Sequence, residues 1–447
     1  MKKNWFYLVA LICSVALFTA CSDDDEPANW QKLPTEAITA ENLTLTTNSQ
    51  AQTNASATLA MIDAQTGTLT LTNAIRGLDE VSMNVTVSEQ NDGSFQFQGS
   101  TSVAMTKAVA DLINSIDVTA SGTITLEGTA TVNVTTAANG YLVKTWNLCD
   151  ATYTDADNNV YGAGKIRWTA SYESATGVNS AENIQQLGTL VLHAIMQQVL
   201  KDVEFRADGA IVASYASEIN LSQDAIMGAI FGGGVDVSGI EWISSPANLA
   251  YWYPSDDNIN VVLDIPSIIA QALQDQGSDS AGIAESIMAV LEQLQSATPA
   301  EIKTILANLL QNVGEGTILA NLDLTQIADE DITKLMNYLT NGFPLKYDIT
   351  TPVLSDGVTT VNDIYVYLDK DFMDILMPAV APLLASPELD TIVSEAVGQY
   401  WSLVKMLLGI NSLADINDIW ASTTLFKVGL DLTDGSFKVP EAETSAE

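Results

Sequence analysis

The feature that most constrains the fold of this chain is a change in the period of its apolar residues near residue 265. Between Leu43 and Tyr172, apolar and polar side chains alternate in several short stretches, whereas after Pro266 apolar residues recur every three or four positions. A period of two places alternate side chains on one face of a β-strand, and a period of three to four does so on an α-helix. The sequence therefore predicts strands first and mostly helices later.

The alternating stretches are typical of antiparallel strands with one buried face. They are LTLTT (43–47), GTLTLTN (67–73), SMNVTVSE (82–89), SFQFQG (94–99), GTITLEGTATVNVT (122–135) and GKIRWTASY (164–172). Turn signals such as Asn91-Asp92-Gly93 and Asp208-Gly209 separate strands at hairpins. We expect a curved antiparallel sheet or partial barrel with one face in water.

One helix, predicted over residues 181–200, interrupts the strands. Apolar residues recur on one side of it and polar residues lie opposite; the apolar set is Ile184, Leu187, Val191, Ala194 and Ile195, and the polar set is Gln186, Thr189 and Gln197. His193, the only histidine of the chain, is expected on the polar, solvated side. Replacing a solvated helical residue changes stability by no more than about 0.5 kcal/mol, so His193 is predicted to be dispensable.

The second half of the chain is predicted to contain several amphipathic helices. They cover residues 268–273, 283–294, 302–310, 324–339, 372–384 and 387–409. Thr298 and Glu301 have the spacing of a capping box, with proline at the first helical position. The predicted fold class is α+β, with curved antiparallel sheets or a partial barrel wrapping long amphipathic helices. We expect a strand-rich domain over 40–265 and a helix-rich α+β domain over 266–447.

The first 20 residues have the order of an export signal: two lysines, an apolar run and small residues at the end. The apolar run is shorter than the roughly 20 residues of a membrane-spanning helix, although an uncleaved anchor is the alternative. The sequence Phe18-Thr19-Ala20-Cys21 resembles a bacterial lipobox, which implies a signal peptide over 1–20 and a lipid on Cys21. Multiple acyl chains on that cysteine would hold the protein stably in a membrane.

Four acids follow Cys21 almost at once, in Ser22-Asp23-Asp24-Asp25-Glu26. Together with the lipobox, this run resembles the surface-export signal of Bacteroidetes lipoproteins. The resemblance implies an outer-membrane lipoprotein that faces the cell exterior, with residues 21–39 as an acidic tether and linker. The alternative is an ordinary solvated acidic linker, because runs of charge commonly have that role.

A further resemblance rests on residues 180–265. A helix, the pattern V-x-F-x-x-D-G-x-I-x-A-x-Y and then S-P-x-N-L-x-Y-W-Y resemble a family of Bacteroidetes lipoproteins that carry a domain of unknown function. This resemblance implies no catalytic residues. At the level of the fold alone, strands wrapped around long helices are similar to the tubular lipid-binding proteins related to bactericidal permeability-increasing protein, and a fold does not define a function.

Charge and cysteine content exclude several classes of protein. Without residues 1–20 the chain has 15 basic and 55 acidic residues, a net charge of −40, so it repels the phosphates of nucleic acids. The charged fraction is 16% against an ordinary value of about 25%, so Ser, Thr, Asn and Gln form much of the polar surface. With Cys13 removed and Cys21 acylated, Cys149 has no partner for a disulfide and is expected to be buried.

The sequence lacks the common catalytic motifs, which favours a protein that is not an enzyme. The sequence contains no G-x-S-x-G, H-E-x-x-H or phosphate-binding loop. Paired carboxylates of a hydrolase remain an alternative, because 55 acids include many accidental pairs. Residues 155–161 resemble a calcium loop, but Val160 and Ile166 stand where the turn glycine and the bidentate glutamate belong, so a turn is expected and no metal or cofactor is predicted.

The segment Phe372 to Leu384 is apolar nearly all round, with Asp374 as its only charged residue. Such a helix is either buried on all sides or forms a wall of an apolar cavity. The second reading gives the hypothesis that a lipid or another apolar small molecule binds there; the candidate ligand-binding residues are Leu376, Ala379, Leu383 and Val397. The alternative is a glycan-binding or adhesion accessory protein, which Trp242, Trp252 and Tyr253 near a hairpin favour.

Overall fold

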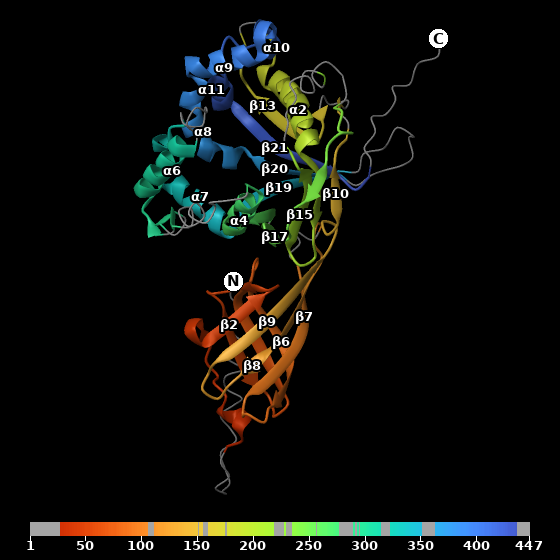
Figure 1. Ribbon diagram of the computed structural model, residues 1–447, viewed down its shortest axis with the longest axis vertical. Coiled ribbons are helices and arrows are strands. Elements are labelled where there is room, and N and C mark those ends of the chain that lie inside the picture. Colours follow the sequence, from red (N-terminus) through yellow and green to blue (C-terminus); the bar gives the residue numbers. More distant parts are fainter. Residues whose placement is uncertain are drawn as a thin grey trace, which may run out of the picture. The chain divides into compact units, whose positions relative to one another are not determined.

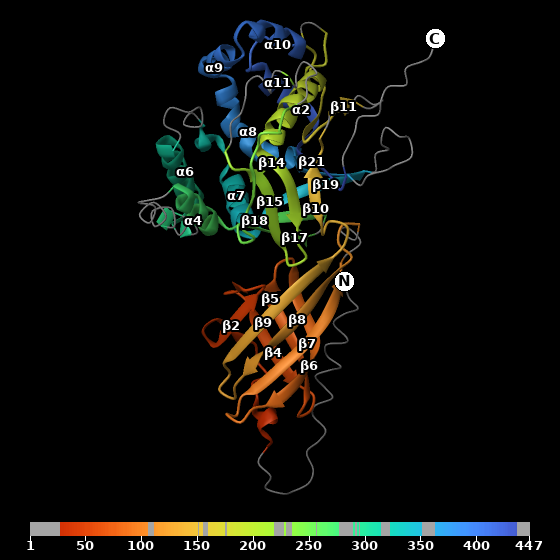
Figure 2. The ribbon, with the colours of Figure 1, turned by 45° about the vertical axis from the view of Figure 1, so that its right-hand side comes forward.

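Figures 1 and 2 show the computed structural model of the chain. It describes residues 27–105, 111–150, 152–154, 160–174, 177–218, 228, 235–255, 257–276, 289–290, 293–294, 296–313, 322–350 and 363–435. Contacts divide the chain into two compact units. The first unit comprises Met1–Thr101 and Thr119–Val134, and the second comprises Ser102–Val118 and Thr135–Glu447.

A nine-stranded sheet forms most of the first unit. Its strands are β1 (Ile38–Thr39), β2 (Leu43–Thr47), β3 (Gln50–Ala51), β4 (Ser56–Met61), β5 (Thr66–Ile75), β6 (Leu78–Glu89), β7 (Phe95–Ala104), β8 (Ser115–Ile124) and β9 (Ala130–Asn139). Short 3₁₀ turns, η1 (Asn29–Lys32) and η2 (Ala40–Asn42), precede β2. The strand order is β1-β4-β5-β6-β7-β8-β9-β2-β3, and β2 runs parallel to β9.

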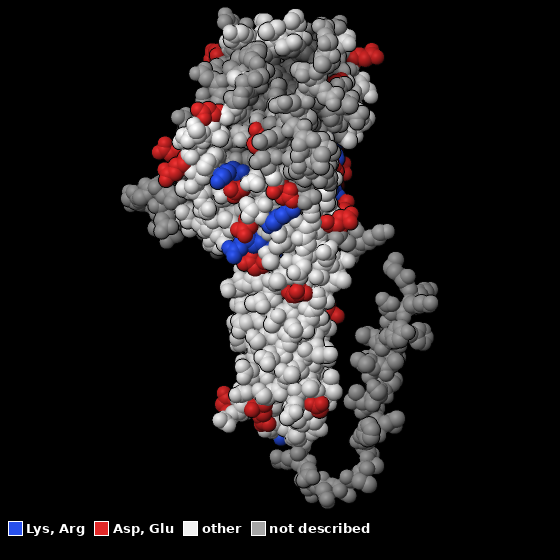
Figure 3. Space-filling view, turned by 90° about the vertical axis from the view of Figure 1, so that its right-hand side faces the viewer, with Lys and Arg blue, Asp and Glu red and all other residues white. Residues whose placement is uncertain are grey.

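The predicted alternation is confirmed in this sheet. In β6, Val81, Met83, Val85 and Val87 are buried, and the residues between them are exposed. The sheet curls, because β2 and β5 are not neighbours in the strand order and yet touch: the hydroxyl of Thr47 donates to the carbonyl oxygen of Ala74 at 2.6 Å. The outward residues are mostly uncharged and polar, and much of the surface in Figure 3 is neither acidic nor basic.

A ten-stranded sheet forms the framework of the second unit. Its strands are β10 (Thr145–Leu148), β13 (Gly164–Ala170), β14 (Leu200–Phe205), β15 (Ala210–Ala216), β16 (Trp242–Ser244), β17 (Ala250–Ser255), β18 (Asn258–Leu263), β19 (Phe343–Thr350), β20 (Asp363–Asp369) and β21 (Thr423–Thr433). Because β10 pairs with both β14 and β21, eight of these strands form a closed ring of neighbours. β13 pairs with β21 at the outer edge, and β11 (Tyr153–Thr154) and β12 (Val160–Tyr161) form a separate hairpin.

The helices of the second unit pack on this sheet and on one another. They are α2 (Ser180–Val199), α4 (Ile265–Gln276), α6 (Pro299–Val313), α7 (Asp329–Asn341), α8 (Lys370–Leu384), α9 (Pro387–Val397), α10 (Trp401–Leu408) and α11 (Asp415–Ala421), with 3₁₀ turns η4 (Leu324–Gln326) and η5 (Gly398–Tyr400). The capping box is confirmed, because the Glu301 carboxylate accepts from the Thr298 backbone N–H at 2.8 Å. Residue 265 lies at the start of α4, and the ten-stranded sheet takes strands from both sides of it.

The predicted fold class, in which curved sheets or a partial barrel wrap long amphipathic helices, is wrong. Strands hold 40% of the residues and helices 33%, and the sheets form a closed eight-stranded barrel and a curled half-barrel. The helices are short: the helix predicted over 387–409 breaks into α9 and α10 at Gly398, which has a φ of +64° and ends α9. Such short helices pack against strands without running through a wrapped sheet.

The buried face of α2 also differs from the prediction. Gln185, Thr189 and His193, four residues apart, are buried against β13, and the predicted apolar residues Ile184 and Leu187 are only partly buried. The reason is that β13 is an edge strand, whose outward N–H groups need acceptors. Polar side chains of α2 supply them.

Three hydrogen bonds join α2 to the edge strand and to the residue that precedes it. Backbone N–H groups of Ala163, Ile166 and Trp168 donate to His193 Nδ1, Thr189 Oγ1 and Gln185 Oε1 at 3.0, 3.0 and 2.8 Å. Gly164 permits the close approach, because a Cβ there would lie 2.7 Å from Cβ of Leu192. Helix α2 therefore takes the place that a further strand would occupy (Figure 1).

Candidate functional site

Exposed apolar side chains lie on α9, on α10 and on the turn η5 between them. Of the nine large apolar side chains exposed among the described residues, five fall between residues 392 and 407. We call these five the α9–α10 patch: Ile392, Tyr400, Leu403, Met406 and Leu407. Met406 is 60% exposed and Leu407 54%. Contiguous exposed apolar residues are characteristic of binding surfaces, whereas single ones are ordinary.

The opposite face of α10 explains why this helix stays on the protein. Trp401 and Leu408 are buried, and Val404 packs against the core formed by Trp168, Ile419 and their neighbours. Leu403, Met406 and Leu407 are three and four residues apart, so they share the other face. Helix α10 is thus apolar on both faces, although burial against the core accounts for only one.

Acidic residues predominate around the α9–α10 patch. Glu388, Asp390 and Glu395 lie on α9, and Lys405 on α10 is placed 3.9 Å from the Asp390 carboxylate. The local charge is therefore negative, like that of the whole chain. An anionic head group would be repelled here, whereas a neutral or cationic one would not.

The predicted ligand-binding residues do not share one surface. Ala379 of α8 is 3% exposed and packs with Leu294, Ile302 and Ile332 in a core between helices. Leu376 and Leu383 are half-buried. Val397 belongs to α9, but its side chain lies outside the described residues, as do Cys21 and the calcium-like residues 155–159.

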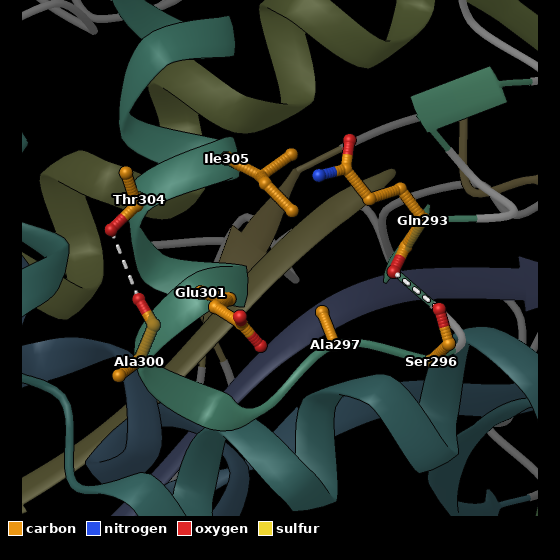
Figure 4. Close-up of a pocket in the computed structure, with 7 residues that line it drawn as sticks. All are labelled: Gln293, Ser296, Ala297, Ala300, Glu301, Thr304 and Ile305. Carbon is orange, nitrogen blue, oxygen red and sulfur yellow. Dashed lines mark hydrogen bonds between the residues drawn. The ribbon is translucent and has the colours of Figure 1, made fainter.

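Two hollows lie elsewhere in the described part of the chain. One, of about 470 Å³, borders the start of α6, and Figure 4 shows its lining: Gln293, Ser296, Ala297, Ala300, Glu301, Thr304 and Ile305. Glu301 is engaged in the capping box there. The other, of about 730 Å³, lies over β5–β7 of the first unit, lined mainly by Thr, Ser, Asn and Gln side chains. Both are open to solvent, so neither is an enclosed cavity.

Trp252 and Tyr253, two of the aromatic residues near the hairpin, are held by contacts within the protein. Trp252 is 4% exposed, its indole N–H donates to the carbonyl oxygen of Arg206 at 3.1 Å, and its ring meets that of Phe205 edge-on. The Tyr253 hydroxyl donates to the carbonyl oxygen of Asn341. Both side chains therefore help to hold the fold, and Trp242 is half-buried.

His193 is buried, which overturns the prediction of a solvated histidine. It is 6% exposed, and Nδ1 accepts the Ala163 N–H described above. Burial lowers the pKa of His193 from 6.5 to about 4, so the imidazole is neutral at physiological pH. Its role here is structural, because the accepting nitrogen is already occupied.

Cys149 is buried as predicted.

A buried charged cluster lies where β13, β21 and β20 run side by side. The Lys165 ammonium is 3.1 Å from Oδ2 of Asp431, with side-chain exposures of 4% and 0%. Asp363, 2% exposed, is the third charged member. In the sheet, Lys165 lies opposite Gly429, Asp431 opposite Tyr365, and Asp363 opposite Thr433. Since side chains at i and i+2 share a face, all three project to the same side of the sheet.

Aromatic rings enclose the Lys165 ammonium. Its Nζ lies 4.0 Å from the ring centre of Tyr161 and 4.6 Å from that of Tyr365. The Tyr365 hydroxyl donates to the carbonyl oxygen of Lys165 at 2.9 Å, and burial, followed by the Asp431 carboxylate, raises the pKa of Tyr365. These rings exclude water while attracting a cation.

The two carboxyl groups of the cluster strongly influence one another. Burial raises the pKa of Asp363 to about 8, and the nearby Asp431 carboxylate adds to this effect. Oδ1 of each aspartate is buried without a hydrogen-bond donor among the described residues. A proton on Asp363 removes the repulsion between the two groups and gives Asp363 a hydrogen to donate. Sequence reasoning missed this cluster; its only local signal is Lys165 within a predicted half-buried strand, because Asp431 comes 266 residues later.

No group of three or more His, Cys, Asp or Glu side chains suited to a metal ion occurs among the described residues. In the same part of the chain, no single helix is long and apolar enough to cross a membrane; only α8 and α9 together meet those criteria, with a bend of 79° between them.

In comparisons with known proteins, no family model, curated protein or solved structure matches this chain.

Proposed function

We propose that this chain is a lipid-anchored outer-membrane protein, exposed at the cell surface, that binds the acyl chain of an amphiphile without catalysing a reaction. The observation that carries the binding proposal is the α9–α10 patch, where both faces of α10 are apolar and only one is covered. The predicted interior site at Leu376, Ala379 and Leu383 is replaced in this proposal by the neighbouring exposed surface. His193 has no catalytic part in it.

The charge around the patch decides which amphiphile fits. Acidic residues on α9 and the net charge of the chain disfavour fatty acid anions and anionic phospholipids. The occupant is therefore an amphiphile with a neutral or cationic head group. Burying ten methylenes contributes about 8 kcal/mol before the cost of association, which corresponds to micromolar binding.

Binding is tested with the Cys21→Ala chain, which lacks the acyl anchor. A fluorescent monoacylglycerol should bind saturably, a long-chain alkylammonium should compete for the same site, and a fatty acid should compete weakly at pH 7. The double substitution Leu403→Ser and Leu407→Ser should weaken binding at least tenfold. Ile62→Ser, which removes a 66% exposed side chain from the first unit, is the matched control and should bind as before.

Two results would contradict the binding proposal. The first is the absence of saturable binding to the unsubstituted patch. The second is a dimer in sedimentation that the double substitution converts to monomer, because the patch would then be covered by a second copy of the chain.

The anchor is tested separately in cells. The lipobox resemblance predicts that Cys21→Ala releases the protein from membrane fractions, and the acidic run predicts that external protease degrades the acylated protein on intact cells. Protection of the wild-type protein from the protease would contradict surface exposure, while leaving acylation of Cys21 standing.

A further inference from the structure

The buried cluster brings the amine of Lys165 together with the carboxyl groups of Asp431 and Asp363. The ammonium and the Asp431 carboxylate are 3.1 Å apart, and both side chains are almost inaccessible to water. The pair joins two neighbouring strands, β13 and β21, whose backbones are hydrogen-bonded along their shared length. Thus a reaction between the two side chains needs no rearrangement of the sheet.

We propose that Lys165 and Asp431 condense to an intramolecular amide that cross-links β13 to β21, with Asp363 carrying the proton between them. Nothing in the proposed binding function requires this bond, and the proposal stands on the geometry of a different part of the second unit.

The reaction balances without a cofactor or an oxidant. The Lys165 ammonium transfers a proton to the carboxyl pair, and the neutral amine attacks Cγ of the protonated Asp431 carboxyl group. The tetrahedral intermediate loses one oxygen of Asp431 as water, for which Asp363 donates a proton, and the nitrogen then returns a proton to Asp363. The net change is one ammonium and one carboxylate converted to one amide and one water, with Asp363 unchanged.

The surroundings of the cluster favour each step. An ion pair in a water-free interior carries a large desolvation penalty, whereas a neutral amine and a neutral acid do not. The free-energy difference between the ion pair and the neutral groups is therefore smaller in the interior than in water. Burial and the Asp431 carboxylate raise the pKa of Asp363 to about 8, which keeps a proton available at neutral pH. The rings of Tyr161 and Tyr365 shield the product amide from water that would reverse the reaction.

A second lysine–aspartate pair on the same sheet provides a matched comparison. Lys427 of β21 lies 2.6 Å from the Asp348 carboxylate on β19, but the two side chains are 22% and 45% exposed. Water therefore solvates both charges. We expect this pair to remain an ordinary ion pair.

The decisive measurement is the intact mass of the Cys21→Ala chain after folding. The proposal predicts a mass lower than that of the sequence by one water molecule, and tandem mass spectrometry of a protease digest should identify a branched peptide that joins Lys165 to Asp431. The cross-linked chain should also migrate faster than its variants in a denaturing gel, because the linkage closes a large loop. A mass equal to that of the sequence would overturn the proposal. A water loss located at any other pair of residues would do the same.

Variants then assign the roles. Lys165→Met and Asp431→Ala should each have the full mass, whereas Lys427→Met should retain the water deficit. Asp363→Asn keeps the shape of the third side chain and removes its acid, and it should slow bond formation at least a hundredfold when the folding chain is followed by mass. An unchanged rate in Asp363→Asn would overturn the role given to Asp363. The circular dichroism spectrum of each variant reports whether it has folded.

Discussion

The nine-stranded sheet of the first unit and the ten-stranded sheet of the second differ in where they place polar side chains. Of twelve polar or charged residues buried among the described residues, only Thr47 belongs to the first unit. The second unit buries the other eleven, including Lys165, His193 and Asp431. Alternating apolar residues are sufficient to define the inner face of the first sheet, whereas the second depends on polar partners that must meet at specific places.

The difference teaches that the two units should respond differently to substitution and to pH. Buried polar groups cost free energy when a partner is removed, because the remaining group cannot regain its water. The mature chain has one tryptophan in the first unit, Trp30, and six in the second. Tryptophan fluorescence therefore follows mainly the second unit during unfolding, and far-ultraviolet circular dichroism follows both.

The largest expected effect is that of Asp431→Ala in the second unit. It leaves the Lys165 ammonium buried without a partner and also removes the proposed cross-link. Removal of one partner from a buried pair alone costs about 3 to 5 kcal/mol. The free energy of unfolding is measured by urea titration followed by tryptophan fluorescence. Asp257→Ala, which breaks the exposed pair with Lys346, is the control and should cost no more than about 1 kcal/mol. Equal costs in the two variants would contradict the special importance given to buried polar pairs in the second unit.

Acid should destabilise the second unit through His193. The unfolded histidine takes up a proton below pH 6.5, while the folded one stays neutral down to about pH 4, so stability is lost as the pH falls through this window. The loss attributable to His193 is about 3 kcal/mol between pH 7 and pH 4. Comparison of urea titrations at the two pH values should show that His193→Gln lacks this part of the loss. An identical acid response in the variant would contradict the buried, neutral histidine.

Removal of one acceptor from the buried stripe of α2 should have an intermediate effect. Thr189→Val keeps the shape of the side chain but leaves the Ile166 N–H without its acceptor, at a cost of about 1 to 3 kcal/mol. Gln186→Ala, on the adjacent part of the same helix, should change stability by less than about 0.5 kcal/mol. Small and equal effects of the two substitutions would instead agree with the predicted orientation, in which both side chains are solvated.

The smallest effect is expected on the outer face of the first unit. The hydroxyls of Thr70 and Ser82 are 2.8 Å apart on the outer face of two neighbouring strands. Thr70→Ala should change stability by less than about 0.5 kcal/mol. Leu71→Ala, one residue later on the inner face, should cost about 2 to 5 kcal/mol. Circular dichroism follows both variants. A costly Thr70→Ala would show that this sheet also depends on its polar side chains.

Local features of the sequence are sufficient to predict a helix or strand that has one face in water and the other against the core. Residues 82–89 alternate as predicted, the hairpin at Asp208-Gly209 is present with Gly209 at a φ of +83°, and the capping box at Thr298 begins α6. The sequence also singles out the apolar segment over 372–384. Only the structure shows that Ala379 is ordinary core while Leu403, Met406 and Leu407 face outward, because helical spacing gives the faces of a helix and not what covers them.

The sequence by itself determined the alternation of the first sheet, the positions of most turns and the apolar character of α8 to α10, since each depends on residues close together in the chain. Tertiary structure alone decided that α2 buries its polar stripe, because the acceptors are needed by an edge strand whose position follows from its pairing with β21. It also decided that Lys165 meets Asp431, which is 266 residues away. Strand register places these charges together, and no local pattern of residues encodes that register.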